Sequence, residues 1–135
     1  ELTAVLQYVY QSVVLSECGM EDAAKTLVDI AVTEMHHLEI LATLICKLGA
    51  PPVYTACPPY PVGYYSSSCV NYTRTPKMMI SADICAERQA IAAYSSMLCK
   101  LNNPCVAAVI ERIIEDEKVH LQAFERMLRE MEQCC

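Results

Sequence analysis

Apolar side chains recur at helical spacing in four stretches of this chain. In the first stretch they stand four residues apart at Val5, Val9 and Val13, which places them on one face of a helix. Gly19 follows this stretch, as is typical just beyond the C-terminus of a helix. The four stretches predict helices at about 1–18, 21–48, 77–101 and 104–132.

The connections between these helices differ in length. The first and the third are short, so each is expected to join an antiparallel helical hairpin. In the third, Asn103 precedes Pro104, the order of an N-cap followed by proline at the first helical position. The middle connection, 49–76, carries six of the seven prolines and five of the eight tyrosines. A crossover that runs the length of a bundle would explain it, and its tyrosines indicate that it packs on protein.

Length and composition agree with one compact fold. A chain of 135 residues is one domain by the usual size of domains, and 54% apolar residues suffice for a substantial core. The predicted fold class is therefore all-α. It is an antiparallel four-helix bundle in which two helical hairpins are joined by a long crossover and 1–135 form a single domain.

Two Glu-x-x-His motifs are the strongest chemical signal in the sequence. Residues three apart lie on one helical face, so each motif can direct a carboxylate and an imidazole to one point. Each motif also has a lone glutamate in the apolar helix that precedes it. The predicted metal ligands are Glu1, Glu34, His37, Glu87, Glu117 and His120.

The spacing of these six residues supports a shared site. Counted outward from the two short turns, all six lie fifteen to eighteen residues away, so they fall at one height within about one helical turn, at roughly 1.5 Å per residue. Four carboxylates in one core need cations to balance them, and two divalent ions would do so. Surface salt bridges are the alternative interpretation of the motifs.

The donor set indicates which metal ions to expect. Carboxylates with imidazoles favour iron or manganese over thiol-seeking metals, and zinc remains an alternative on affinity grounds. We therefore expect two metal ions per chain, with iron favoured over manganese.

An internal repeat accompanies the motifs. Residues 1–8 align with 87–94, and each segment starts with a predicted ligand and ends with a tyrosine, Tyr8 or Tyr94. A separation of seven residues returns to almost the same helical face. Both tyrosines are therefore expected to lie beside the carboxylates and to form hydrogen bonds there, with ordinary core packing as the alternative.

Charge and hydropathy exclude several classes of partner. The net charge of −6, with scattered lysines and arginines, argues against nucleic acid and anionic membrane surfaces. The chain has no run of eighteen uncharged apolar residues and no signal-peptide pattern. We expect a cytoplasmic protein. Because a ligand at a frayed first residue would hold metal poorly, we also expect residues upstream of Glu1.

The motifs resemble those of the ferritin-like superfamily of carboxylate-bridged di-metal proteins, in particular the rubrerythrin-like group. Three stretches carry the resemblance: Glu-Leu-Thr-Ala-Val-Leu-Gln-Tyr at 1–8, Glu-Met-His-His-Leu-Glu-Ile-Leu at 34–41 and Glu-Asp-Glu-Lys-Val-His-Leu at 115–121. The resemblance implies an up-down bundle with a crossover and ligand roles for the six residues above.

Two departures narrow that resemblance. Rubrerythrins carry a further glutamate one turn after the third-helix ligand, where this chain has Ala90, and a rubredoxin domain with Cys-x-x-Cys motifs, which this chain lacks. The six-ligand set is also similar to that of bacterioferritins and manganese catalases. The expected function is redox chemistry on peroxide or dioxygen, of the peroxidase, catalase or ferroxidase type. A peroxidase would need an external electron donor.

Nine cysteines suggest a second function class. Free thiols in a reducing cytoplasm are one interpretation. The other is a structural protein on a ferritin-like fold, crosslinked by disulfides into a layer or fibre such as a protective coat. Either way we expect a homo-oligomer. The cysteines predicted to crosslink lie at helix ends, in the crossover or at the C-terminus: Cys18, Cys57, Cys69, Cys105, Cys134 and Cys135.

Overall fold

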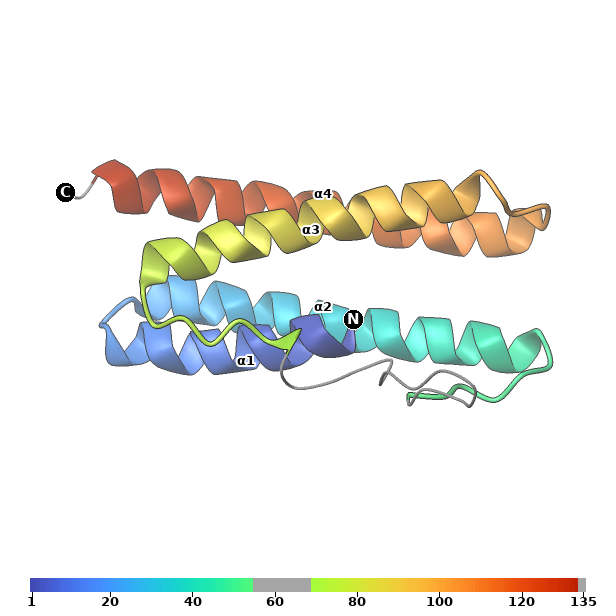
Figure 1. Ribbon diagram of the computed structural model, residues 1–135, viewed down its shortest axis with the longest axis horizontal. Coiled ribbons are helices and arrows are strands. Elements are labelled where there is room, and N and C mark those ends of the chain that lie inside the picture. Colours follow the sequence, from blue (N-terminus) through green and yellow to red (C-terminus); the bar gives the residue numbers. More distant parts are fainter. Residues whose placement is uncertain (55–68, 134–135) are drawn as a thin grey trace. The chain divides into compact units, whose positions relative to one another are not determined.

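The computed structural model describes residues 1–54 and 69–133, and in these ranges all regular structure is helical. The helices are α1 (Leu2–Glu17), α2 (Glu21–Lys47), α3 (Pro76–Leu98) and α4 (Pro104–Gln133). α1 packs against α2, and α3 packs against α4 (Figure 1). The predicted all-α class and the pairing into two hairpins are confirmed.

Two compact units make up the chain, Glu1–Tyr72 and Thr73–Cys135. The first contains the hairpin of α1 and α2, and the second contains the hairpin of α3 and α4. The prediction that 1–135 form one domain stays a prediction. Among the described helices, none has a stretch both long and apolar enough to cross a membrane.

Glycine ends both helices of the first unit. Gly19 has a φ of 75°, a conformation that side chains with a Cβ rarely adopt. Its N–H donates to the Ser16 carbonyl at 2.8 Å, and the Met20 N–H donates to the Leu15 carbonyl at 3.0 Å. These two bonds satisfy carbonyls that the end of α1 would leave open. Gly49, with a φ of 89°, ends α2 in the same way.

A short segment after the undescribed part of the crossover lies against α1. The Asn71 N–H donates to Oε1 of Gln7 at 2.8 Å. The Tyr10 hydroxyl donates to the Tyr72 carbonyl at 3.1 Å, and the two rings meet edge to face with centroids 5.1 Å apart. Val70 is buried. This end of the crossover therefore packs on protein, as its tyrosine content predicts.

The second unit follows the predicted start and stop signals. Asn103 caps α4, since its Oδ1 accepts from the Cys105 N–H at 3.0 Å and the Val106 N–H at 3.3 Å. Pro104 is the first residue of α4. α3 ends at Leu98 instead of near residue 101, because the chain tightens there: the Lys100 N–H donates to the carbonyl only three residues before it.

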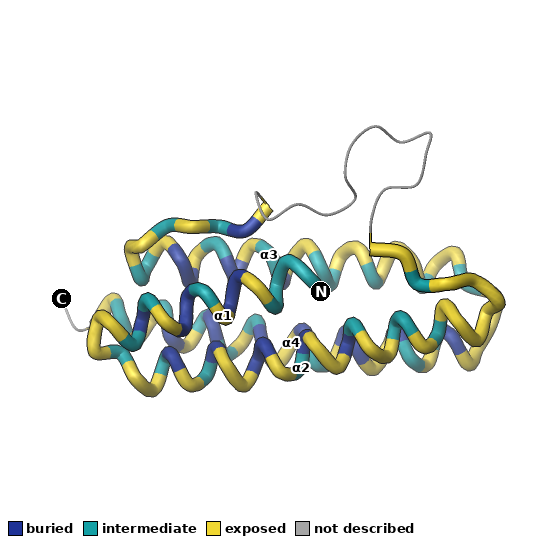
Figure 2. Tube along the Cα trace, turned by 90° about the horizontal axis from the view of Figure 1, so that it is seen from below, coloured by how far each residue is buried: buried dark blue, intermediate teal, exposed yellow. Residues whose placement is uncertain are grey.

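Burial alternates along every helix, so that each presents one covered stripe (Figure 2). Leu15 and Leu27 in the first unit, and Met79, Ile110 and Phe124 in the second, are almost fully covered. The same stripes also contain carboxylates and imidazoles, and these form the candidate site.

Candidate metal centre

The motif on α2 places a carboxylate and an imidazole together inside the first unit. Glu34 is 1% exposed and His37 is 2% exposed. Nδ1 of His37 lies 3.2 Å from Oε2 of Glu34. The two residues stand three apart on one helical face, so local geometry alone produces this contact.

Glu1 joins this pair from the start of α1. One carboxylate oxygen of Glu1, one of Glu34 and one ring nitrogen of His37 lie within 4.8 Å of one another. Glu1 is half-buried and is the N-cap residue of α1. Three donors of the kind that iron and manganese accept are therefore gathered in the first unit.

The second unit repeats this arrangement on α3 and α4. Nδ1 of His120 lies 3.3 Å from Oε2 of Glu117. Glu87 on α3 completes the set, because its carboxylate and the donors of Glu117 and His120 also lie within 4.8 Å of one another. All three side chains are buried. Each unit thus holds two carboxylates and one imidazole, which we call a half-site.

The donor chemistry of each half-site suits a cation. Moving carboxylates out of water costs several kcal/mol per charge unless an opposite charge compensates. Basic side chains of the second unit form ion pairs with carboxylates at the surface. Nη2 of Arg88 lies 2.7 Å from Oε1 of Glu125, Nη2 of Arg112 lies 3.1 Å from Oδ1 of Asp116, and Nζ of Lys118 lies 2.7 Å from Oε1 of Glu115. A divalent ion in each half-site would supply compensating charge from within.

The predicted tyrosines differ in their surroundings. Tyr8 is 1% exposed, whereas Tyr94 is only half-buried. The two tyrosines therefore differ in burial although they occupy equivalent positions of the sequence repeat. His36, which is adjacent to His37, is exposed and so lies outside the buried half-site.

No cysteine in the described ranges belongs to the closely spaced donor groups. Every cysteine in the described ranges is free and exposed, namely Cys18, Cys46, Cys69, Cys85, Cys99 and Cys105. Three further cysteines, Cys57, Cys134 and Cys135, lie outside the described residues.

One buried acidic residue was missed by the sequence analysis. Asp83 on α3 is 0% exposed and lies four residues before Glu87. An acidic residue at that spacing, inside an apolar helical face, was a signal available in the sequence.

Comparison with known proteins identifies the family. The family model described as the ferritin-like domain matches residues 1–134. The chain belongs to the ferritin-like family. Its hairpins accordingly form the all-α four-helix bundle of that family, as the sequence predicts.

Bacterioferritin of Desulfovibrio desulfuricans is one relative of this ferritin-like chain. The two sequences are 32% identical over 130 residues, a match that covers 94% of this chain and 67% of the relative. A crystal structure of the bacterioferritin from that organism superposes with a TM-score of 0.78 at 27% identity, over 98% of this chain and 73% of the other. That work describes its diiron site in different catalytic states.

Metal binding should stabilise the folded chain. A ligand present at 100 times its dissociation constant adds about 2.7 kcal/mol for each occupied site, because it binds only the native state. We expect Co²⁺ or anaerobic Fe²⁺ to raise the unfolding temperature of the metal-free protein, and His37→Ala to remove much of that rise. Thermal unfolding followed by circular dichroism measures both effects.

The neighbouring histidine provides the matched control. His36→Ala removes the same side chain from an exposed position of the same helix, so it should keep the full stabilisation. Equal responses of the two variants would contradict the assignment of His37 as a ligand.

Proposed function

We propose that this chain is a di-iron carboxylate oxidoreductase of the bacterioferritin type, which oxidises ferrous iron with dioxygen or peroxide. The observation that carries the proposal is the pair of half-sites, each with two carboxylates and an imidazole at matched positions on a helical hairpin. Its family and its likeness to a protein with a diiron site support the same conclusion.

In this proposal each half-site binds one ferrous ion. Glu1, Glu34 and His37 hold one ion, and Glu87, Glu117 and His120 hold the other. Each ferrous ion gives up one electron, and the oxidant accepts the pair. The four glutamates would balance the charge of two ferrous ions, while the apolar residues around them limit access of water.

The proposed ligands and the matches to bacterioferritin indicate which metal ion and which type of di-metal protein to expect. Carboxylate and imidazole donors suit iron and manganese alike, and the diiron relative favours iron. The sequence match and the structural match to bacterioferritin favour the bacterioferritin type over the rubrerythrin-like type, in line with Ala90, which stands where rubrerythrins carry a further glutamate. Peroxidase and catalase activities are the competing reactions of such a centre.

Tyr8 is proposed to support the first half-site. It is buried on α1, seven residues after Glu1 and thus on nearly the same helical face. A buried phenol requires a hydrogen-bond partner, and carboxylates are strong acceptors. Tyr94 has the equivalent place in the second unit with more exposure, so we expect its replacement by phenylalanine to have the smaller effect.

Loss of one ligand should abolish iron oxidation. We expect Glu34→Ala and His120→Ala to slow ferrous oxidation at least about 100-fold, since even residues outside the ligand shell cost 10- to 100-fold. Oxygen consumption and the rise of ferric absorbance after anaerobic Fe²⁺ loading measure the rate. Wild-type rates in either variant would refute the proposal, and His36→Ala serves as the control with unchanged rate.

The exposed apolar surface of the first unit is proposed to bind a second copy of the chain. Large apolar side chains there are 41% to 61% exposed, and they follow helical spacing on both helices. Exposed apolar patches of this kind mark protein interfaces. The residues are Leu6, Val9 and Val13 on α1 and Val28, Val32 and Met35 on α2.

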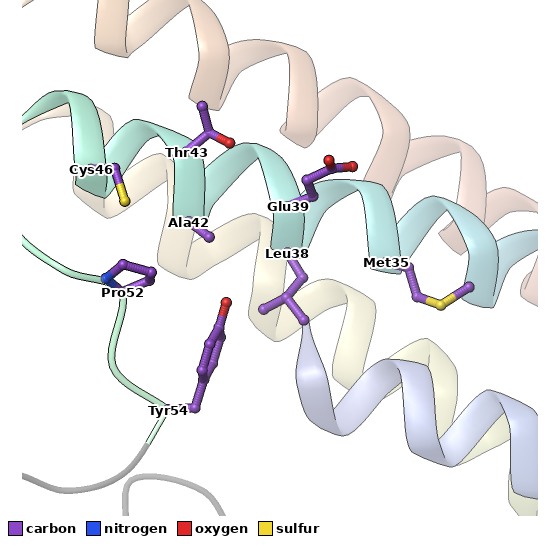
Figure 3. Close-up of a pocket in the computed structure, with 8 residues that line it drawn as sticks. All are labelled: Met35, Leu38, Glu39, Ala42, Thr43, Cys46, Pro52 and Tyr54. Atoms are coloured by element: carbon purple, nitrogen blue, oxygen red, sulfur yellow. The ribbon is translucent and has the colours of Figure 1, made fainter.

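A groove that includes Met35 lies along α2. It has a volume of about 460 Å³, and its lining is mixed: Met35, Leu38, Glu39, Ala42, Thr43 and Cys46 from α2, and Pro52 and Tyr54 from the chain that follows. In Figure 3 the Tyr54 hydroxyl points toward α2. Side chains of the second copy would bury against this surface, and a self-complementary contact gives a twofold dimer.

Charged substitutions on this face should dissociate the oligomer. Val9→Glu combined with Val32→Glu places carboxylates where apolar burial of about 25 cal/mol per Å² drives association. We expect the wild type to elute as an oligomer and the double variant as a monomer, as measured by size-exclusion chromatography with light scattering. Val119→Glu, on the exposed side of α4, is the control. A monomeric wild type would refute this interface.

A disulfide-linked coat or layer is the second candidate function. The observation in its favour is that the six described cysteines are all exposed and free to pair between molecules. In this case the protein would work in an assembly exposed to oxidising conditions, whereas the iron-oxidising function fits a protein of the cytoplasm.

Gel electrophoresis separates the two candidates. A structural role predicts ladders on non-reducing gels of natively isolated protein, and these ladders should collapse with reductant. Cys18→Ser combined with Cys105→Ser should shorten them. A single monomer band with and without reductant would exclude the crosslinked assembly.

A further inference from the structure

Asp83 is a buried carboxylate outside the set of closely spaced donors. It is 0% exposed and belongs to the covered stripe of α3, together with Met79, Ile80, Ile84 and Glu87. Aspartate is almost never fully buried in proteins unless it is paired, because its desolvation is costly. A carboxylate at this covered position is therefore expected to interact with charged or polar groups around it.

The helix geometry places Asp83 next to the second half-site. It stands four residues before Glu87 on the same face of α3, which separates the two Cβ atoms by about 5–6 Å. Glu87 itself lies within 4.8 Å of Glu117 and His120 through its ligand atoms.

The hairpin also sets the level of Asp83 along α4. α3 and α4 run in opposite directions from a short turn. Moving from Glu87 to Asp83 leads away from that turn, and moving from Glu117 to His120 does the same. Asp83 therefore lies at the His120 end of the half-site, within the second unit.

We propose that Asp83 is a positioning residue for the cation held by Glu87, Glu117 and His120, an inference that rests on the proposed function. The closely spaced donor groups include Glu87 but not Asp83, so Asp83 acts from outside the ligand shell. Its negative charge, in an interior that screens charge weakly, strengthens binding of a cation one helical turn away. Residues in such places hold and orient the ligands of metal sites.

This role distinguishes the two cations of the proposed centre. Asp83 belongs to the second unit and neighbours Glu87, so its removal should act mainly on one of two binding steps. If Asp83 only filled space, its replacement would alter the stability of the fold and leave the affinities of both binding steps unchanged.

The test is a Co²⁺ titration of the full metal-free chain and its Asp83→Asn variant. Asparagine keeps the shape of the side chain and removes its charge. We expect one of the two binding steps to weaken about 10- to 100-fold, with a changed Co²⁺ ligand-field spectrum. The unfolding temperature of the metal-free variant should be equal to or higher than that of the wild type, because a buried charge has been removed.

Two further variants make the result specific. Glu111→Gln removes an exposed charge from α4 of the same unit and should leave both binding steps unchanged. Asp83→Leu replaces the carboxylate by an apolar group, and it tests the proposal where the asparagine variant does not fold. It should fold and show the same weakened step.

The outcomes separate this inference from the proposed function. If the wild type binds two Co²⁺ ions, and Asp83→Asn or Asp83→Leu binds both with the same affinities as the wild type, the role of Asp83 alone is overturned. A lowered unfolding temperature with both binding steps intact would assign Asp83 to packing and would also overturn it. Wild-type protein that takes up no Co²⁺ would refute the proposed function as well.

Discussion

The desolvation of carboxylates is the constraint on which the interior of this protein depends. Glu34 and Glu117 are almost completely covered, and each lies beside the imidazole of its own motif. An apolar core cannot hold such groups without charge compensation or hydrogen bonds. The hairpins must therefore bring candidate ligands together as well as bury leucine and isoleucine. The residues that pack the core and the candidate ligands lie on the same few helical turns.

The helical period allows one face of a helix both to pack the core and to carry polar donors. Residues three or four apart share a face, so a covered stripe can alternate apolar packing with polar donors without bending the helix. In the second unit Ile113 and Ile114 precede Glu117, and Phe124 follows His120, all of them buried. The packing residues fix the backbone on both sides of the candidate ligands, and a rigid support of this kind is what a metal site needs.

Much of this arrangement could be predicted because it is local. The ends of α1 and α2 follow from Gly19 and Gly49, whose positive φ suits glycine, and the start of α4 follows from Asn103. The contact within each Glu-x-x-His motif follows from the helix alone. Contacts between distant residues could not be predicted in this way. The hydrogen bond from Asn71 to Gln7 joins residues 64 positions apart, and no periodic pattern encodes it.

By itself, the sequence determined the helices, their pairing into hairpins and the chemical type of the six candidate ligands, because periodicity, short turns and residue identity are properties of neighbouring positions. Tertiary packing decided which of the remaining polar and aromatic residues are covered. It buries Asp83 completely and Tyr8 almost so, while leaving Tyr94 half-buried despite the repeat. Burial depends on what a helix packs against, and that partner is distant in the chain.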